Sequence, residues 1–246
     1  MTPAPDDVGN RVRRPRVRDV SADLDQSALA DLLREIGVPT GVPAVVLVGG
    51  AGGLTIEQLR PCQELVGFGV LPAVAEAGAV LIDGGTDSGV MAIAGRARES
   101  SGSGFTHVGV VAGGTVRSPE GSAAVENPAD LEANHTHILV VPGDTWGEET
   151  PWISAVATAV ATGAPSVTVL VNGGNVAFRD VRQSLEVGRP VIVLSGTGRS
   201  ADQITDAVLG ESADPAAVAL AASPLVTVVP PDTEAVRSAI AAALDT

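Results

Sequence analysis

Short apolar runs, each followed by a glycine-bearing turn and then by apolar residues at helical spacing, recur along the 246 residues of this chain. The clearest case extends from Ala79 to Gly95, where residues 79–82 are apolar throughout and residues 83–89 read DGGTDSG. A run that is apolar at every position indicates a strand covered on both faces of its sheet. Strand, tight turn and helix, repeated in this order, favour parallel strands joined by helical crossovers.

Seven mainly apolar runs, most of them followed by a glycine-bearing turn, predict seven strands. They lie at residues 44–48, 79–82, 107–112, 136–141, 166–171, 191–194 and 225–229. The predicted fold class is therefore α/β, a Rossmann-like, doubly wound, mostly parallel sheet of about seven strands with helices on both faces.

In this interpretation the chain divides into a tail and one domain. Residues 1–24 are predicted to be a flexible tail that carries many arginines, because they contain no long apolar run. Residues 25–246 are predicted to form a single Rossmann-like domain, since a chain of this length can bury one sizeable core. Residues 115–133 are polar and are predicted to be a long loop.

The charge balance excludes several functions. The formal net charge is −14, whereas broad binding to nucleic acid or to a membrane surface needs a basic face. All 15 basic residues are arginine, so a P-loop lysine and a Schiff-base lysine are excluded. Any phosphate must be held by backbone amides, hydroxyl groups or arginine.

Other bulk features concern location and assembly. Cys62 is the one cysteine, so we expect no internal disulfide and no cysteine-based zinc site. The start of the chain lacks the apolar core of a secretory signal, and no run reaches the ~18 apolar residues that cross a bilayer, so we expect a cytoplasmic protein without membrane insertion. Alanine-rich helical faces at residues 154–161 and 235–244 favour a homo-oligomer.

Glycine-rich turns follow five of the predicted strands. In parallel sheets ligands bind beyond the carboxyl ends of the strands, and N–H groups at a helix start stabilise anions, so these turns predict a ligand that carries phosphate or ribose. The candidate ligand-binding residues are Gly49, Gly50, Gly52, Gly84, Gly85, Thr86, Asp87, Ser88, Gly89, Gly113, Asp144, Thr145, Gly173, Gly174, Asn175, Gly196, Thr197, Gly198, Arg199 and Ser200. The alternative is that the glycines serve turn geometry alone.

Two of these turns carry additional polar groups. The turn at residues 84–89 is the best candidate for phosphate contact, because Thr86 and Ser88 add hydroxyl groups, while Asp87 either accepts from a ribose hydroxyl or caps the helix. Arg199 adds a guanidinium for phosphate in one interpretation and forms a surface salt bridge in the other.

At these turns the sequence resembles the SLOG superfamily of Rossmann-like domains. It is most similar to the LSDAT type, the N-terminal homology region of melastatin-type TRP channels and its prokaryotic stand-alone relatives. The segments that carry the resemblance are LIDGGTDSGVMAIAG at 81–95, NHTHILVVPGDTWGEE at 134–149, VTVLVNGGN at 167–175 and RPVIVLSGTGRSAD at 189–202.

The resemblance spans roughly residues 43–209 and implies a sensing domain for nucleotide-derived ligands, with ADP-ribose-like compounds as the leading expectation. Ser195 and Asn172 stand where the channels usually carry acidic residues. No other cofactor is firmly predicted.

The carboxylates after the fourth run leave two alternatives. SLOG relatives that hydrolyse cytokinin phosphoribosides carry a glutamate early in the helix after a PGG-type loop, which makes Glu148 or Glu149 an acid/base or nucleophilic group for an N-glycosidic bond. Residues 142–144 lack the second glycine. The favoured alternative is a capping box, in which Thr145 caps the helix start and the Glu148 side chain bonds back to the Thr145 backbone.

Aromatic and histidine side chains add two further hypotheses. Trp146 lies at a strand end and is placed to stack on a base. His135 and His137 would face the same way on a strand, which makes a metal pair conceivable, but we favour positioning hydrogen bonds and predict no metal.

Three functions follow. The preferred hypothesis is a nucleotide-binding sensor without chemistry of its own. The second is a hydrolase of nucleotide N-glycosidic bonds, and the third is an assembly protein whose glycine turns serve only tight packing.

Overall fold

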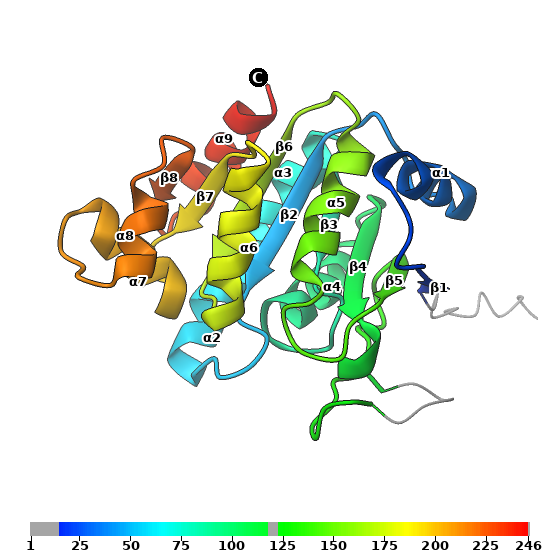
Figure 1. The fold of residues 1–246 in the computed structure, drawn as a ribbon. Coiled ribbons are helices and arrows are strands. Elements are labelled where there is room, and N and C mark those ends of the chain that lie inside the picture. Colours follow the sequence, from blue (N-terminus) through cyan, green and yellow to red (C-terminus); the bar gives the residue numbers. More distant parts are fainter. Residues whose placement is uncertain (1–14, 118–122, 246) are drawn as a thin grey trace, which may run out of the picture.

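The computed structural model describes residues 15–117 and 123–245, in which a single sheet of eight strands runs through the molecule (Figure 1). The strand order is β1-β5-β4-β3-β2-β6-β7-β8, and every neighbouring pair is parallel. The strands are β1 (Arg16–Asp19), β2 (Ala44–Gly49), β3 (Val80–Asp83), β4 (His107–Ala112), β5 (His137–Val141), β6 (Ser166–Val171), β7 (Val191–Leu194) and β8 (Val226–Val229). The predicted α/β, Rossmann-like class is confirmed.

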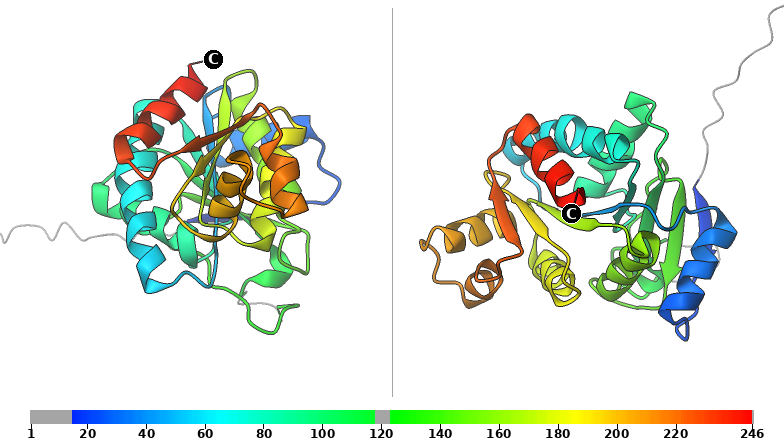
Figure 2. Two further views of the ribbon diagram at one scale, coloured as in Figure 1. Left: turned by 90° about the vertical axis from the view of Figure 1, so that its left-hand side faces the viewer. Right: turned by 90° about the horizontal axis from the view of Figure 1, so that it is seen from above.

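Helices cover both faces of this sheet (Figure 2, right). One face carries α1 (Gln26–Ile36), α5 (Thr150–Ala161), α6 (Asn175–Glu186), α7 (Arg199–Val208) and α8 (Pro215–Ala221). The other carries α2 (Ile56–Glu64), the π-helical segment η1 (Leu65–Val70), α3 (Leu71–Glu76), α4 (Gly89–Ser101) and α9 (Thr233–Leu244). A short 3-10 turn, η2 (Gly113–Thr115), follows β4.

Each face has its own apolar core, and the central strand β2 supplies both. Val46 and Val48 belong to the core under α5 and α6, whereas Val45 and Leu47 belong to the core under η1 and α4. Successive strand residues point to opposite faces, so a strand covered by helices on both sides must be apolar at every position. This requirement explains the unbroken runs in the sequence.

The expectation of a tail through residue 24 is wrong for residues 16–19. They form β1, an exposed edge strand that pairs in parallel with β5, with Arg16 opposite His137. The Arg16 guanidinium also donates to the carbonyl of Ile36 at 3.0 Å. A charged edge strand needs no apolar run, since its backbone supplies the pairing. Residues 1–14 of the predicted tail and residues 118–122 of the predicted long loop lie outside the described residues.

The two alanine-rich helices that favoured an oligomer both contribute to the cores of the chain. Val156, Ala157 and Val160 of α5 are buried in one core, and Val236 and Ile240 of α9 in the other. The α5 face is therefore used within the chain, whereas Ala241 and Ala242 of α9 are exposed.

The direction in which strands are added reverses at β2. The chain passes from β2 through β3 and β4 to β5, then returns to β6 on the opposite side of β2. Gly49 and Val171 are paired at the ends of these two neighbours. From there the chain continues to α2 on one face and to α6 on the other, which opens a crevice between the two turns.

Candidate functional site

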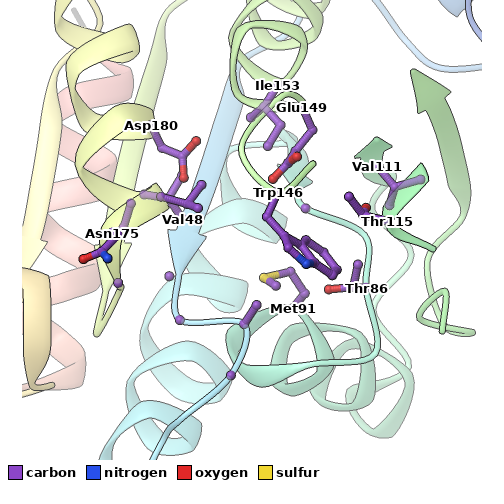
Figure 3. A pocket seen from close by; sticks show the side chains of 18 of the residues that line it. Val48, Thr86, Met91, Val111, Thr115, Trp146, Glu149, Ile153, Asn175 and Asp180 are labelled. Atoms are coloured by element: carbon purple, nitrogen blue, oxygen red, sulfur yellow. The ribbon is translucent and has the colours of Figure 1, made fainter. Parts of the chain in front are cut away.

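A cavity of ≈ 220 Å³ lies at this crevice (Figure 3). Its walls come from the carboxyl ends of six strands, β2 to β7, and from the residues that follow them. The lining residues are Leu47, Val48, Gly49, Gly50, Ala51, Gly52, Gly84, Thr86, Met91, Val111, Ala112, Thr115, Trp146, Glu149, Ile153, Gly174, Asn175, Val176, Ala177, Asp180 and Arg199. Nine of the predicted ligand-binding or catalytic residues are therefore brought together, at positions 49, 50, 52, 84, 86, 149, 174, 175 and 199.

Two rows of backbone N–H groups border the crevice. In the described part of the chain, no hydrogen bond starts from the N–H groups of residues 50–53 or of residues 173–176. The second row is the start of α6, which no side chain caps. A helix start with free N–H groups carries a partial positive charge and favours an anion.

The Arg199 guanidinium lies between these two rows. Its Nη1 donates to the carbonyl of Gly52 at 2.7 Å, and no carboxylate in the described residues pairs with it. A Cβ on Gly174 would lie 2.7 Å from Nη2, and one on Gly50 would lie 3.1 Å from Nη1. The two glycines thus make room for the cation.

Arg199 also has a left-handed backbone, with φ +54°. Such a conformation costs a non-glycine residue about 1–2 kcal/mol and concentrates at functional sites. Cation and free amides together form an anion-binding corner at the junction of β2, β6 and β7.

The turn at residues 84–89, our best sequence candidate for phosphate, has three of its six backbone N–H groups bonded within the protein. The N–H of Gly85 donates to Asp83, that of Asp87 to the carbonyl of Asp130, and that of Ser88 to the carbonyl of Thr86. Asp87 pairs with Arg96. Gly84 and Thr86 alone among these six residues line the cavity.

At Gly89 this turn packs closely against the turn after β2. Its φ is +50°, and a Cβ there would lie 1.7 Å from the carbonyl oxygen of Gly50. That same carbonyl accepts from the N–H of Val90. Glycine is required at position 89 by backbone packing, whatever the ligand.

The turn at residues 196–200 is filled by a carboxylate of the protein. Asp202 accepts from the N–H of Gly196 at 2.7 Å and from that of Gly198 at 3.0 Å. The Thr197 hydroxyl is buried and donates to Leu194, while Ser200 donates to Gly174. Because Asp202 takes the place of an external anion, Arg199 is the residue through which this turn reaches the cavity.

Four further candidates from the sequence do not line the cavity. Gly113 lies beside Val140, and Gly173 packs on Ala177. Asp144 and Thr145 donate their N–H groups to the Glu148 carboxylate.

The carboxylates after β5 separate into two roles. Glu148 is exposed, and the N–H groups of Asp144 and Thr145 lower the pKa of its carboxyl. Helix α5 begins only at Thr150, so Thr145 is not its cap. The Glu148 carboxylate nevertheless accepts from the backbone N–H of Thr145, as expected. Glu149 lines the cavity, where burial raises the pKa of its carboxyl.

Asp180, on the second turn of α6, is a further acid in the cavity wall. Its Oδ1 accepts from the Thr150 hydroxyl at 2.6 Å. Burial, and then the charge of Glu149, raise the pKa of Asp180 to about 7. Figure 3 shows both carboxyl groups on the same side of the cavity, with Trp146 below them and Met91 and Thr86 beyond it.

A buried ion-pair network lies beneath α4 and holds the neighbouring turn. His135 donates from Nε2 to Asp83 and from Nδ1 to Glu132, both at 2.8 Å, and His107 donates from Nε2 to Asp83 at 2.9 Å. An imidazole that donates from both nitrogens is protonated. His135 is therefore the cation between two carboxylates.

The pKa values agree with this assignment. Burial alone would lower the pKa of His135, but Asp83 and then Glu132 raise it to about 9. Burial, and then the charge on His135, lower the pKa of His107 to about 4, so that ring is neutral. The two histidines hold the pKa of Asp83 well below its usual range, against the effect of burial.

Asp83, His107 and His135 are also the residues whose ligating atoms lie close enough together to hold a metal, within 4.8 Å of one another. Both Nε2 atoms are engaged with Asp83, which is the arrangement of an ion-pair network. The idea that His135 and His137 face the same way on one strand is wrong, because β5 begins only at His137, whose Nε2 donates to the carbonyl of Ile36.

Comparison with known proteins identifies the family. The family model described as "SLOG in TRPM, prokaryote" matches residues 42–239. The chain belongs to this family. The resemblance seen in the sequence is thereby confirmed.

A solved structure with the same fold is the molybdenum cofactor carrier protein of Chlamydomonas reinhardtii. It superposes with a TM-score of 0.53, covers 83% of this chain and 99% of its own length, and is 19% identical. At this identity the likeness concerns the fold.

For this SLOG protein, sequence reasoning missed Asp180 altogether. Nothing in the helix after residue 174 distinguishes Asp180 from an ordinary solvated acid, and only the packing of α6 against α5 turns it into the cavity. Met91 is buried in the core and also lines the cavity. No helix in residues 15–117 or 123–245 has the length and hydropathy needed to cross a membrane.

Proposed function

We propose that this SLOG protein is a cytoplasmic module that binds a nucleotide-derived ligand, ADP-ribose-like or another nucleotide, in the crevice between β2 and β6. One observation carries the proposal. Arg199 and the two rows of unpartnered N–H groups converge beside a cavity whose other walls are largely apolar. This combination matches an anionic group attached to a flat, partly apolar body.

The size of the cavity determines which part of the ligand it can enclose. Pockets for drug-sized ligands are roughly 300–1,000 Å³, so a cavity of ≈ 220 Å³ holds a base or a ribose, with the phosphates in the open crevice. Trp146 is about one-third exposed and borders the cavity, where its ring is placed to stack on a base. The protein of similar fold is named as a cofactor carrier, which supports a small-molecule role.

Calorimetric titration with nucleoside 5′-monophosphates and ADP-ribose tests this proposal. A charge-assisted hydrogen bond contributes about 1.5–3 kcal/mol, so Arg199→Ala should weaken binding by roughly 10- to 100-fold. Arg182→Ala is the matched control, because Arg182 is exposed on α6 and lies outside the cavity lining. Absence of heat and of any melting shift with the whole panel would instead support the purely structural alternative.

Hydrolysis of an N-glycosidic bond is the second candidate. It is favoured by Glu149 and Asp180, two acids with raised pKa in one cavity, as acid/base catalysis requires. Chromatography of nucleotide mixtures after incubation would detect the released base. Glu149→Gln should abolish that release, while Glu148→Gln, with its carboxylate outside the cavity, should retain it.

A further inference from the structure

Two acids in the cavity wall, Glu149 and Asp180, affect which nucleotide base can bind there. Glu149 Oε2 accepts from the N–H of Gly147 at 2.9 Å, and Asp180 Oδ1 accepts from Thr150. Within the described residues no donor reaches the other oxygen of either carboxyl group. Both groups point into the cavity (Figure 3). When these carboxyl groups are ionised, a ligand with N–H donors can pair with their free oxygens, whereas ring acceptors would leave two desolvated carboxylates unpaired.

A second polar group faces the same space. The Thr86 side chain is 3% exposed, and its hydroxyl has no hydrogen-bond partner. In Figure 3 the hydroxyl points toward Met91 and Trp146, across the cavity from the acids. A buried hydroxyl without a partner costs about 1–3 kcal/mol, which a ring carbonyl or ring nitrogen of a ligand would recover.

The spacing along α6 sets the length of the ligand. Asp180 follows Asn175 by five residues, which at ~1.5 Å per residue places it about 7.5 Å along the helix from the anion-binding corner. An inorganic phosphate is too short to reach both ends. A mononucleotide with its base directed at the acids can reach them.

We propose that Glu149 and Asp180 select a guanine base through its adjacent N1–H and N2–H donors, with the Trp146 ring stacked on it. The inference rests on the proposed function, since the same nucleotide places its phosphate at Arg199. Two parallel N–H donors match the two oxygens of a carboxylate, as in bidentate pairing with a guanidinium. Adenine presents a ring acceptor at the corresponding position and is disfavoured by the same carboxyl group.

Calorimetry with GMP, IMP and AMP tests the selection, because the three nucleotides share the phosphate and ribose. GMP should bind at least tenfold more tightly than AMP, and IMP, which lacks the N2 amine, should lie between them. Asp180→Asn should weaken GMP at least tenfold and AMP less than threefold. Arg199→Ala should weaken all three by a common factor.

Proton release supplies a readout that a structural role would not change. Binding of N–H donors keeps Asp180 ionised, and its unliganded carboxyl is half protonated near pH 7, so GMP should release about half a proton. Titrations in two buffers of different ionisation enthalpy measure this number. AMP with the wild type, and GMP with Asp180→Asn, should release none.

The outcomes separate the two proposals. Equal affinities for GMP, IMP and AMP, all weakened by Arg199→Ala, would overturn the guanine selection and leave the nucleotide site standing. A preference for AMP would overturn it as well. No binding of any nucleotide would overturn both.

Discussion

The His135 network predicts a loss of stability in mildly alkaline solution. The folded pKa of His135 is about 9, above its ordinary value of about 6.5. For a base with a raised pKa, the stabilisation is complete below pH 6.5 and is lost as the pH rises through 9. The difference corresponds to about 3 kcal/mol, most of which is lost between pH 6.5 and pH 9.

Urea unfolding at half-unit steps from pH 6.5 to pH 9 measures this loss. We expect the free energy of unfolding of the wild type to fall by about 2–3 kcal/mol over this range. In His135→Gln the fall should nearly vanish, because the amide stays neutral, although the variant is less stable at pH 6.5 with two buried carboxylates left without their cation.

Other titrating groups are controlled separately. The Asp180 carboxyl, with a pKa of about 7, titrates in the lower part of this pH range, so the Asp180→Asn variant, titrated in parallel, removes its contribution. The Cys62 thiol titrates outside the window on the native side, since burial raises its pKa to about 11. The reasoning fails if the wild type loses less than about 0.5 kcal/mol, or if His135→Gln keeps the full slope.

Three further predictions concern single residues. Asp180→Asn should stabilise the unliganded protein at pH 8 by up to about 4 kcal/mol, less where water enters the cavity, because a carboxyl whose folded pKa is raised to about 7 favours the unfolded state once the unfolded carboxyl ionises; urea unfolding should show this full gain at pH 8 and about half of it or less at pH 5. Gly89→Ala should lower the free energy of unfolding by more than about 1 kcal/mol, since φ +50° and the Gly50 carbonyl both oppose a Cβ, whereas the open Gly104→Ala should be nearly neutral. Cys62 should react with a disulfide reagent at pH 8 only after urea is added, because its thiol is buried and protonated; rapid reaction of the native protein would contradict its placement.

Most strands could be predicted because a sheet covered on both faces demands apolar residues at every position. Residues 107–112, 166–171 and 191–194 were predicted with their observed bounds. The edge strand β1 was not, since its four residues are all exposed and its stability depends on pairing with β5, more than 100 positions away. The capping box of Thr55 and Gln58, by contrast, is a local pattern formed by residues three positions apart.

The candidate site, too, could be predicted from the sequence only in part. The sequence shows glycine-rich turns after strands, and it contains no lysine. A candidate anion site made of backbone amides and arginine could therefore be predicted. Which amides remain free could not be anticipated, because Asp202 and Asp83 reach their turns from helix α7 and strand β3 and occupy the N–H groups that looked most available.

The sequence by itself determined the class of fold and the rim on which a ligand would meet the backbone, because both follow from short-range patterns of apolar residues and glycine. The tertiary structure alone decided which groups meet there. Asp180 enters the cavity through the packing of α6 on α5, and His135 is a cation only because two distant carboxylates surround it. Burial and charge depend on neighbours brought together by folding, and the order of residues along the chain does not record them.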